Sequence, residues 1–427
     1  MTTIKTVNAR RVWDSRGRPT VEVEIGTESG ALGRGIAPAG ASRGSAEAID
    51  LRDGGTAHGG MDVQQALRGI REEIAPLLIG REVHDQKDID HCLIELDGTP
   101  NKSRLGGNAT IATSLAVLQA AAASEQQPLW RYLAGDVPVA LPIPQIQIFG
   151  GGAHAGRRVD VQDFMVIAVG ATSFQQALEM TSEVYLAAGR LMASRHGVKG
   201  VADEGGWWPD FTSNEEALDV LVQAIEAAGY TPGKDISIAL DIASSEFGKQ
   251  GRYHLALDDR TLDSAAWTDV LLGWLDKYPI ISIEDPLAED DPQGLADFTR
   301  QAGGRVQIVG DDFLVTNADK VAQAAAQGAC NAVLIKPNQA GTVTETYDAL
   351  LAARQHGYAT IVSARSGETE DTAIVDLSTG WNAGQLKVGS FSRSERMAKW
   401  NAAIRLEDQG QVRGGFSGSS VLAGQPR

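Results

Sequence analysis

The stretch 278–291, YPIISIEDPLAEDD, is a short apolar run that ends abruptly in two acids. The run is too short for an isolated helix, it is rich in β-branched isoleucine, and Pro286 closes it, so it predicts a fully buried parallel strand. Ligands bind at the carboxyl ends of such strands, which makes Glu284 a candidate site residue. Taken alone, a single acid at this place is more often a helix cap or a surface loop residue.

Five further apolar runs share this design, because each of them ends in a charged residue. The runs are SIALD, which ends at Asp241, RVQIVGDD at Asp311 and Asp312, NAVLIK at Lys336, TIVSAR at Arg365, and GQLK at Lys387. From Glu284 to Arg365 the charges recur every 25 to 29 residues, which suits one strand, one helix and two loops. The sequence therefore predicts an α/β protein with a (β/α) barrel, whose mouth gathers three acids, two lysines and an arginine.

Composition limits the class of protein. A chain of 427 residues with 43% hydrophobic residues is expected to form two soluble domains. No apolar run approaches the roughly 20 residues of a membrane span, and the first residues lack the apolar segment of a secretory signal. The net charge of −17 argues against nucleic acid or an anionic membrane as a partner. Cys92 and Cys330 read as reduced core thiols, which suits a cytoplasmic location.

The order of the patterns predicts two domains. Residues 1–137 read as an α+β capping domain, an antiparallel meander followed by helices, with a mobile lid loop or a plain connection at 38–44. Residues 138–413 read as the barrel, and 414–427 as a loose tail. Strand patterns at 141–149 and 159–169 precede helical patterns at 173–195 and 214–228. The barrel is therefore expected to open strand, strand, helix, helix.

Three acids at successive strand ends, Asp241, Glu284 and Asp311, would repel one another without a cation. Oxygen ligands of this kind suit Mg²⁺, whereas the absence of histidine and cysteine from these strand ends argues against zinc. Lys336 and Lys387 would lie across the mouth, where nearby positive charge lowers the pKa of a lysine toward the range of a general base. The alternative for each lysine is an ion pair with the neighbouring acids.

Two further groups are candidates for ligand binding. Arg365 and Ser366 precede a helical start and predict a site for a phosphate or carboxylate. Glu204 and His154 lie in glycine-flanked turns, VADEGG and GGGAHAG, at which a structural and a functional role are about equally expected.

At these residues the chain resembles the enolase family. The resemblance runs from SRGRPTVEVEI to RSERMAKWNAAIRLED, through DGTPNKSRLGGNA, DEGG, LDIASSEF, SIEDPLAEDD, IVGDD, LIKPNQAGT, SGETEDT and GQLKVGS. It implies a cap plus an enolase-type (β/α)8 barrel, usually a dimer, that converts 2-phosphoglycerate to phosphoenolpyruvate with one or two Mg²⁺ ions per site. A lysine base with Mg²⁺ is the chemistry of this superfamily.

The resemblance also implies a role for each matching residue. Asp241, Glu284 and Asp311 would bind the first Mg²⁺, and Ser42 in the lid would bind the second. Lys336 would remove the C2 proton, Lys387 would hold the substrate carboxylate, and Glu204 would assist hydroxide departure. His154 would lie near the leaving group and phosphate, and Arg365 with Ser366 would bind the phosphate.

Three positions depart from the family pattern. Ala364 replaces the histidine of SHRSGETED, Asp163 shortens an active-site glutamate by one methylene, and Arg43 follows Ser42 in the lid where the family has threonine. A displaced carboxylate can cost on the order of a hundredfold in rate. All three changes fall on the leaving-group and phosphate side, and the metal and base side is intact.

Three functions are compatible with these changes. The first is a phosphopyruvate hydratase of glycolysis in which Arg43 partly replaces the lost histidine charge. The second is an enzyme of phosphonate biosynthesis resembling carboxyphosphonoenolpyruvate synthase, which would transfer phosphonoformate from a cytidine nucleotide conjugate to a three-carbon acid, with Ala364 making room for this larger partner. The third is an inactive moonlighting homologue, against which the intact acids and lysines argue.

Overall fold

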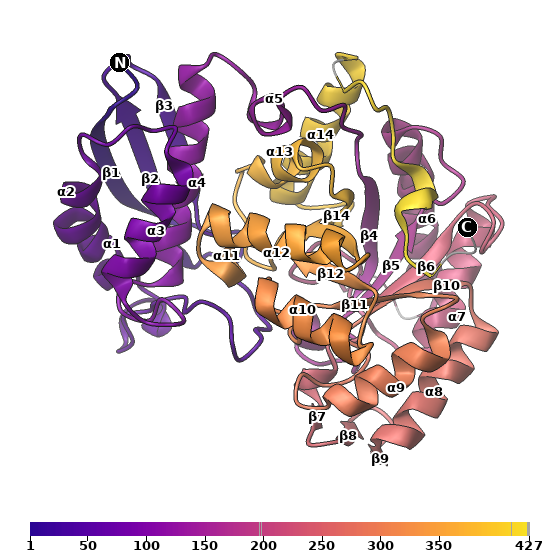
Figure 1. Cartoon of the computed structure of the whole chain (residues 1–427). Coiled ribbons are helices and arrows are strands. Elements are labelled where there is room, and N and C mark those ends of the chain that lie inside the picture. Colours follow the sequence, from indigo (N-terminus) through magenta and orange to yellow (C-terminus); the bar gives the residue numbers. More distant parts are fainter. Residues whose placement is uncertain (196, 198, 411, 425–427) are drawn as a thin grey trace.

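The computed structural model describes residues 1–427 except 196, 198, 411 and 425–427. The first part is an antiparallel sheet covered by helices, seen beside the barrel in Figure 1. Its strands are β1 (Ile4–Trp13), β2 (Pro19–Thr27) and β3 (Leu32–Ile36). Its helices are η1 (Ala57–Gly60), α1 (Gln64–Gly69), the π-helical η2 (Ile70–Ile74), α2 (Ala75–Leu78), α3 (Gln86–Asp97), α4 (Gly107–Ser124) and α5 (Leu129–Ala134).

The alanine-rich helix α4 packs closely on this sheet. A Cβ atom on Gly33 would lie 2.1 Å from the carbonyl oxygen of Ala116, and one on Gly35 would lie 2.3 Å from that of Ala112. Glycines on β3 therefore let the helix backbone approach the strand directly. The expected antiparallel meander and its covering helices are present.

The second part is a closed barrel with the strand order β10-β11-β12-β13-β14-β4-β5-β6. Its strands are β4 (Ile143–Gly150), β5 (Asp163–Ile167), β6 (Ser237–Asp241), β10 (Ile280–Glu284), β11 (Gln307–Gly310), β12 (Ala332–Ile335), β13 (Ala359–Ser363) and β14 (Gly384–Ser390). Only β5 runs antiparallel to its neighbours. The expected opening is confirmed, since β4 and β5 precede α6 (Phe174–Arg195) and α7 (Asn214–Ala227).

The other barrel helices alternate with the strands. They are α8 (Ser264–Lys277), α9 (Pro292–Ala302), α10 (Ala318–Gln327), α11 (Pro337–Ala340), α12 (Val343–Gln355), α13 (Ala373–Gly380) and α14 (Ser394–Asp408), with short helices η3 (Gly152–Ala155), η4 (Ser244–Glu246) and η5 (Gly418–Val421). Local sequence sets their ends. Asn317 accepts a hydrogen bond from the backbone N–H of Lys320 at 3.0 Å, and α10 ends at Gly328 in the left-handed conformation.

A small third sheet was not predicted. It consists of β7 (Gly248–Lys249), β8 (Arg252–Leu255) and β9 (Arg260–Asp263), and it lies below the barrel in Figure 1. Its strands are two to four residues long, too short for a period of two to stand out.

The expectation of a loose tail was wrong for the described residues 414–424. Phe416 pairs with Leu141 through a β-bridge, and Leu422 is buried in a cluster with Ile143 and Met165. A Cβ atom on Gly424 would lie 2.5 Å from the carbonyl oxygen of Val306. The apolar side chains of Leu422 and Phe416 bury surface against the barrel, so the segment stays attached despite its glycine-rich sequence.

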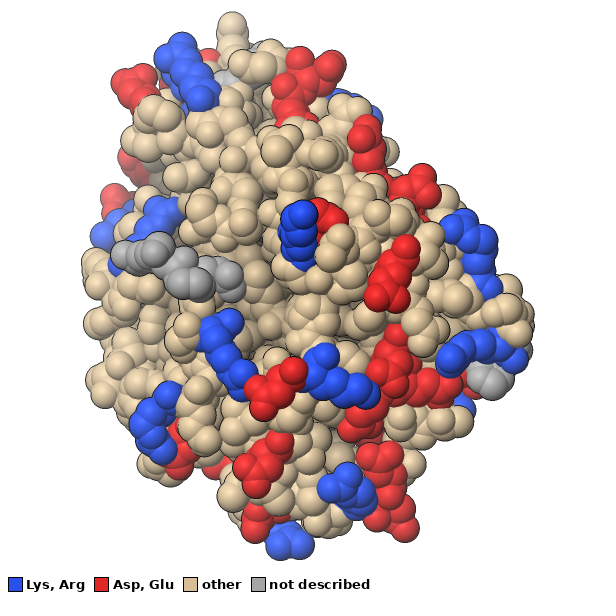
Figure 2. Space-filling model, turned by 90° about the vertical axis from the view of Figure 1, so that its right-hand side faces the viewer, with Lys and Arg blue, Asp and Glu red and all other residues tan. Residues whose placement is uncertain are grey.

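The surface is mixed in charge. On the face shown in Figure 2, Lys and Arg are scattered among Asp and Glu rather than gathered in one patch. Within the described part of the chain, no helix combines the length and the apolar character needed to cross a membrane.

Candidate active site

The mouth of the barrel collects the charged strand ends. Asp241 and Glu284 are the last residues of β6 and β10, and Lys336 directly follows β12. Because β5 runs antiparallel, its first residue, Asp163, pairs in register with Asp241 at the same end. A cavity of about 20 Å³ lies here, lined by Gly40, Ala41, Ser42, His154, Gln162, Asp163, Glu204, Asp241, Lys336, Ser363, Ala364, Arg365, Ser366 and Lys387.

Among the predicted substrate-binding residues, Arg43 is the one that does not line this cavity. It is exposed to solvent, and it does not line the cavity although its neighbour Ser42 does. The expectation that Arg43 supplies charge in place of the missing histidine is therefore not met in this arrangement of the lid.

Both lysines form ion pairs with the acids. The Lys387 ammonium nitrogen lies 2.8 Å from Asp241 Oδ2, 2.7 Å from Glu284 Oε2 and 3.7 Å from Asp163 Oδ2. The Lys336 nitrogen lies 2.5 Å from Asp311 Oδ2. Burial alone would lower the pKa of each lysine, but the carboxylates outweigh it and raise both, that of Lys387 well above its usual value. The sequence predicts a lowered pKa for these lysines. Their pKa values are raised instead, because the carboxylates lie within ion-pair distance of the ammonium groups.

His154 and Asp163 form a buried pair. His154 Nδ1 lies 2.9 Å from Asp163 Oδ1, and His154 Nε2 lies 3.9 Å from Glu204 Oε1. Burial opposes protonation of the imidazole, but Asp163 and Glu204 together raise its pKa to about 9. Burial likewise opposes ionisation of Asp163, and the charge of His154 overcomes it and lowers the pKa of the carboxyl group to about 2. The two acids therefore favour the protonated form of the imidazole, which lies beside Glu204.

The lid lies against the loop that follows β13. The backbones of Ala39 and Gly367 exchange two hydrogen bonds of 2.9 Å, and the N–H of Ala41 donates to Ser366 Oγ at 2.6 Å. The Arg365 guanidinium donates to the carbonyl oxygen of Ser42 at 3.0 Å. The predicted anion site, Arg365 with Ser366, is thus brought together with the predicted lid.

Comparison with known proteins agrees with this geometry. Residues 4–133 match the family model described as the enolase N-terminal domain, and residues 138–424 match that of the enolase C-terminal TIM barrel domain. The chain belongs to the enolase family. Enolase 1 of Desulfitobacterium hafniense (strain Y51) is 50% identical over 408 residues, which cover 95% of this chain and 93% of that protein. The chain is therefore an enolase-family lyase, and the family acts on a phosphorylated three-carbon acid.

Enolases depend on magnesium in general, and the acids here fit that ion. Glu284 Oε1 is buried without a hydrogen-bond partner, and burial together with repulsion by Asp241 raises the pKa of this carboxyl group well above its usual value. An orphaned oxygen among hard oxygen donors suits a divalent cation. Within the described residues, however, the acid clusters close enough to hold one ion are His154 with Asp163 and Glu204, and Asp285 with Asp311 and Asp312. The expected trio of ligands is not one of these clusters: Lys387 contacts Asp241 and Glu284, while Asp311 pairs with Lys336.

Sequence reasoning missed four residues that support the site. Asp285 accepts hydrogen bonds from the backbone N–H groups of Asp311 and Asp312 at 2.9 and 2.7 Å. Gln162 donates to Asp241 at 3.1 Å, and Gln339 donates to Asp311 at 2.8 Å. Glu47 pairs with Arg365 at 2.9 Å. Asp285 and Gln162 could have been suspected because each directly neighbours a predicted site residue in the sequence. Glu47 and Gln339 lie far along the chain from the site residues that they contact, Arg365 and Asp311.

Proposed function

We propose that this chain is a phosphopyruvate hydratase, which removes the C2 proton of 2-phosphoglycerate and expels the C3 hydroxyl as water to give phosphoenolpyruvate. The observation that carries the proposal is that Lys336, Lys387 and Glu204 line one cavity together with Arg365 and Ser366. This cavity thus combines a base, an acid and cationic groups for two anionic ends of a substrate.

Each residue has a task in this proposal. Lys336 takes the C2 proton, for which its side-chain nitrogen must first lose the proton that its ion pair with Asp311 favours. Lys387 holds the substrate carboxylate. Glu204 donates a proton to the departing C3 hydroxyl, so that water leaves. Arg365 and Ser366 bind the phosphate and fix the orientation of the substrate.

The metal site is part of the same proposal. Asp241, Glu284 and Asp311 would hold Mg²⁺, and Ser42 in the lid would bind a second ion. When bound, Mg²⁺ supplies positive charge that stabilises the charge developing on the substrate carboxylate.

The test is direct. Purified protein with Mg²⁺ and 2-phosphoglycerate is expected to form phosphoenolpyruvate, followed by its ultraviolet absorbance, and a chelator is expected to stop the reaction. A folded protein that binds Mg²⁺ but forms no phosphoenolpyruvate contradicts the proposal. Neither the structure nor the comparisons favour the synthase, so a cytidine nucleotide conjugate remains a prediction from the sequence, as do the homo-dimer and the cytoplasmic location.

A further inference from the structure

Glu47 is a buried acid that directly follows the lid loop 38–44. Its residue is 4% exposed, and its carboxylate accepts hydrogen bonds from both sides of the site. Oε1 accepts from the backbone N–H of Gly44 at 3.1 Å and from Gln339 Nε2 at 3.2 Å. The two carboxylate oxygens also accept from the two terminal nitrogens of Arg365, at 2.9 and 3.1 Å.

These contacts leave Arg365 little freedom. Besides the two hydrogen bonds to Glu47, its terminal nitrogens donate to Asn338 Oδ1 at 3.1 Å and to the carbonyl oxygen of Ser42 at 3.0 Å. Four of the five guanidinium N–H groups are therefore engaged. The guanidinium is held in one plane before any phosphate arrives, and Glu47 provides half of the bonds that hold it.

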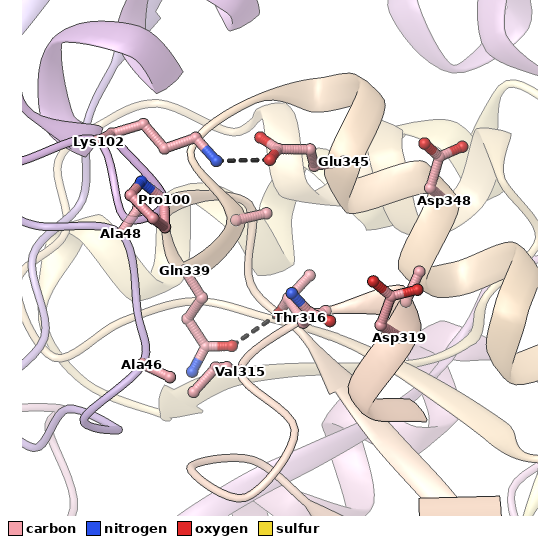
Figure 3. A pocket seen from close by; sticks show the side chains of 13 residues that line it. Ala46, Ala48, Pro100, Lys102, Val315, Thr316, Asp319, Gln339, Glu345 and Asp348 are labelled. Atoms are coloured by element: carbon pink, nitrogen blue, oxygen red, sulfur yellow. Dashed lines mark hydrogen bonds and ion pairs between the residues drawn. The ribbon is translucent and has the colours of Figure 1, made fainter. Parts of the chain in front are cut away.

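Gln339 extends the contacts of Glu47 to the base side. Its amide nitrogen also donates to Asp311 at 2.8 Å, and its amide oxygen accepts from Thr316 Oγ1 at 2.6 Å. Thr316 Oγ1 in turn accepts from the backbone N–H of Lys336 at 2.9 Å. Figure 3 shows Gln339 pointing toward Thr316 at the edge of a cavity of about 220 Å³ between the cap and the barrel.

We propose that Glu47 is a positioning residue that sets Arg365 in place and links it to the lid at Gly44 and, through Gln339, to the base side of the site. The proposal rests on the proposed function for its kinetic effect and on the contacts alone for its effect on the lid. Loss of Glu47 loosens the guanidinium and the Gly44 end of the lid together.

The variant Glu47→Gln tests this role. It keeps the shape of the side chain, but its amide nitrogen faces donors, either Arg365 or the Gln339 amide and the Gly44 N–H. We expect kcat to fall about ten- to a hundredfold with a smaller change in KM, because misplacement of a catalytic group by about 1 Å costs on the order of a hundredfold. Glu47→Asp keeps the negative charge on a side chain one methylene shorter. Its kcat is expected to lie between that of Glu47→Gln and that of the native protein.

Tryptic cleavage gives a readout that does not need activity. Arg43 is exposed in the lid, and the next residue, Gly44, donates its N–H to Glu47. We expect Glu47→Gln to speed cleavage after Arg43 roughly tenfold, since a charge-assisted hydrogen bond that holds the lid is lost. Mass spectrometry identifies the fragment that begins at Gly44.

The control is Glu22→Gln. Glu22 is also 4% exposed and also pairs with arginines, Arg10 at 2.5 Å and Arg34 at 3.7 Å, but it lies in the cap sheet. It is expected to change neither kcat nor cleavage after Arg43. Native kcat and native cleavage in Glu47→Gln would overturn the proposal, as would equal changes in both variants. If the native protein forms no phosphoenolpyruvate, the proposed function fails, while the cleavage rates still decide the role of Glu47.

Discussion

Replacing Asp163 by asparagine should uncouple His154 from its charge partner while keeping the shape of the side chain. The carboxylate is fully buried, and it accepts hydrogen bonds from His154 and from Gln147. Asparagine can still accept a hydrogen bond from His154 Nδ1, so the variant removes chiefly the negative charge.

The structure gives the size of the effect. The pKa of His154 is raised from 6.5 to about 9, and one unit corresponds to about 1.4 kcal/mol, so the shift amounts to about 3 kcal/mol. The pKa of Asp163 is lowered from 3.8 to about 2, which corresponds to about 2 kcal/mol. The two values differ because each includes the burial cost of its own group and other neighbours, Lys387 for Asp163 and Glu204 for His154. The interaction between His154 and Asp163 therefore contributes about 2 to 3 kcal/mol to the stability of the folded protein.

The pH window of this stabilisation follows from the two shifts. A raised imidazole pKa contributes stability that is fully present below pH 6.5 and is lost as pH rises through about 9. A lowered carboxyl pKa contributes stability that is present above about pH 4 and is lost as pH falls through about 2. The Asp163→Asn variant should therefore show its largest deficit in the free energy of unfolding between about pH 4 and 6.5.

The assay is an NMR titration of the histidine ring protons in metal-free protein, with His154→Gln used to assign the signal. We expect the pKa of His154 to fall by about two units in Asp163→Asn, and by less in Glu204→Gln, because Glu204 lies 3.9 Å away rather than 2.9 Å. A His154 signal that still titrates near 9 in Asp163→Asn refutes the electrostatic reasoning.

Three other substitutions test the general base, the metal site and the stability of the fold one at a time. Lys336→Ala should keep Mg²⁺ binding but lose hydrogen exchange at C2 of 2-phosphoglycerate, and retained exchange in deuterium oxide would exclude Lys336 as the base. Glu284→Gln should keep or raise the Tm of metal-free protein, because burial and Asp241 disfavour the carboxylate, yet abolish the rise in Tm on adding Mg²⁺. Asp90→Ala should cost about 2 to 3 kcal/mol of stability in urea, since Asp90 accepts two hydrogen bonds from Thr344 across the cap and barrel; native stability would refute this.

The barrel could be predicted because its signals are local. A buried strand that ends in a charge is visible within a few residues, and Asp241, Glu284 and Lys336 all lie at such ends in the structure. Helix ends were readable for the same reason: Ser213 accepts a hydrogen bond from the backbone N–H of Glu216 at 3.0 Å, as its place before a helical pattern indicates.

What could not be predicted depends on contacts between distant segments. The pairing of Lys387 with Asp241 spans 146 residues, and that of Arg365 with Glu47 spans 318. No period or spacing encodes such a pairing, so the sequence left ion pair and free base as alternatives for the lysines. The tail was misjudged because Leu422 supplies its attachment through a long-range apolar contact in a segment rich in glycine and serine.

Ala364 stands where the family pattern predicts a histidine, and the structure indicates which cationic groups lie near this side of the proposed site. Arg43 is exposed and does not line the cavity, and Arg365 is already paired with Glu47, so neither adds a positive charge to the cavity in place of the histidine. Arg16 is also paired, with Asp14 at 3.5 Å, but it donates to Ser366 Oγ at 3.2 Å and its buried Nε has no hydrogen-bond partner. Burial lowers the pKa of Arg16, and an incoming phosphate oxygen would relieve that cost. Compensation for the histidine absent at Ala364 is therefore expected from the cap, through Arg16, rather than from the lid.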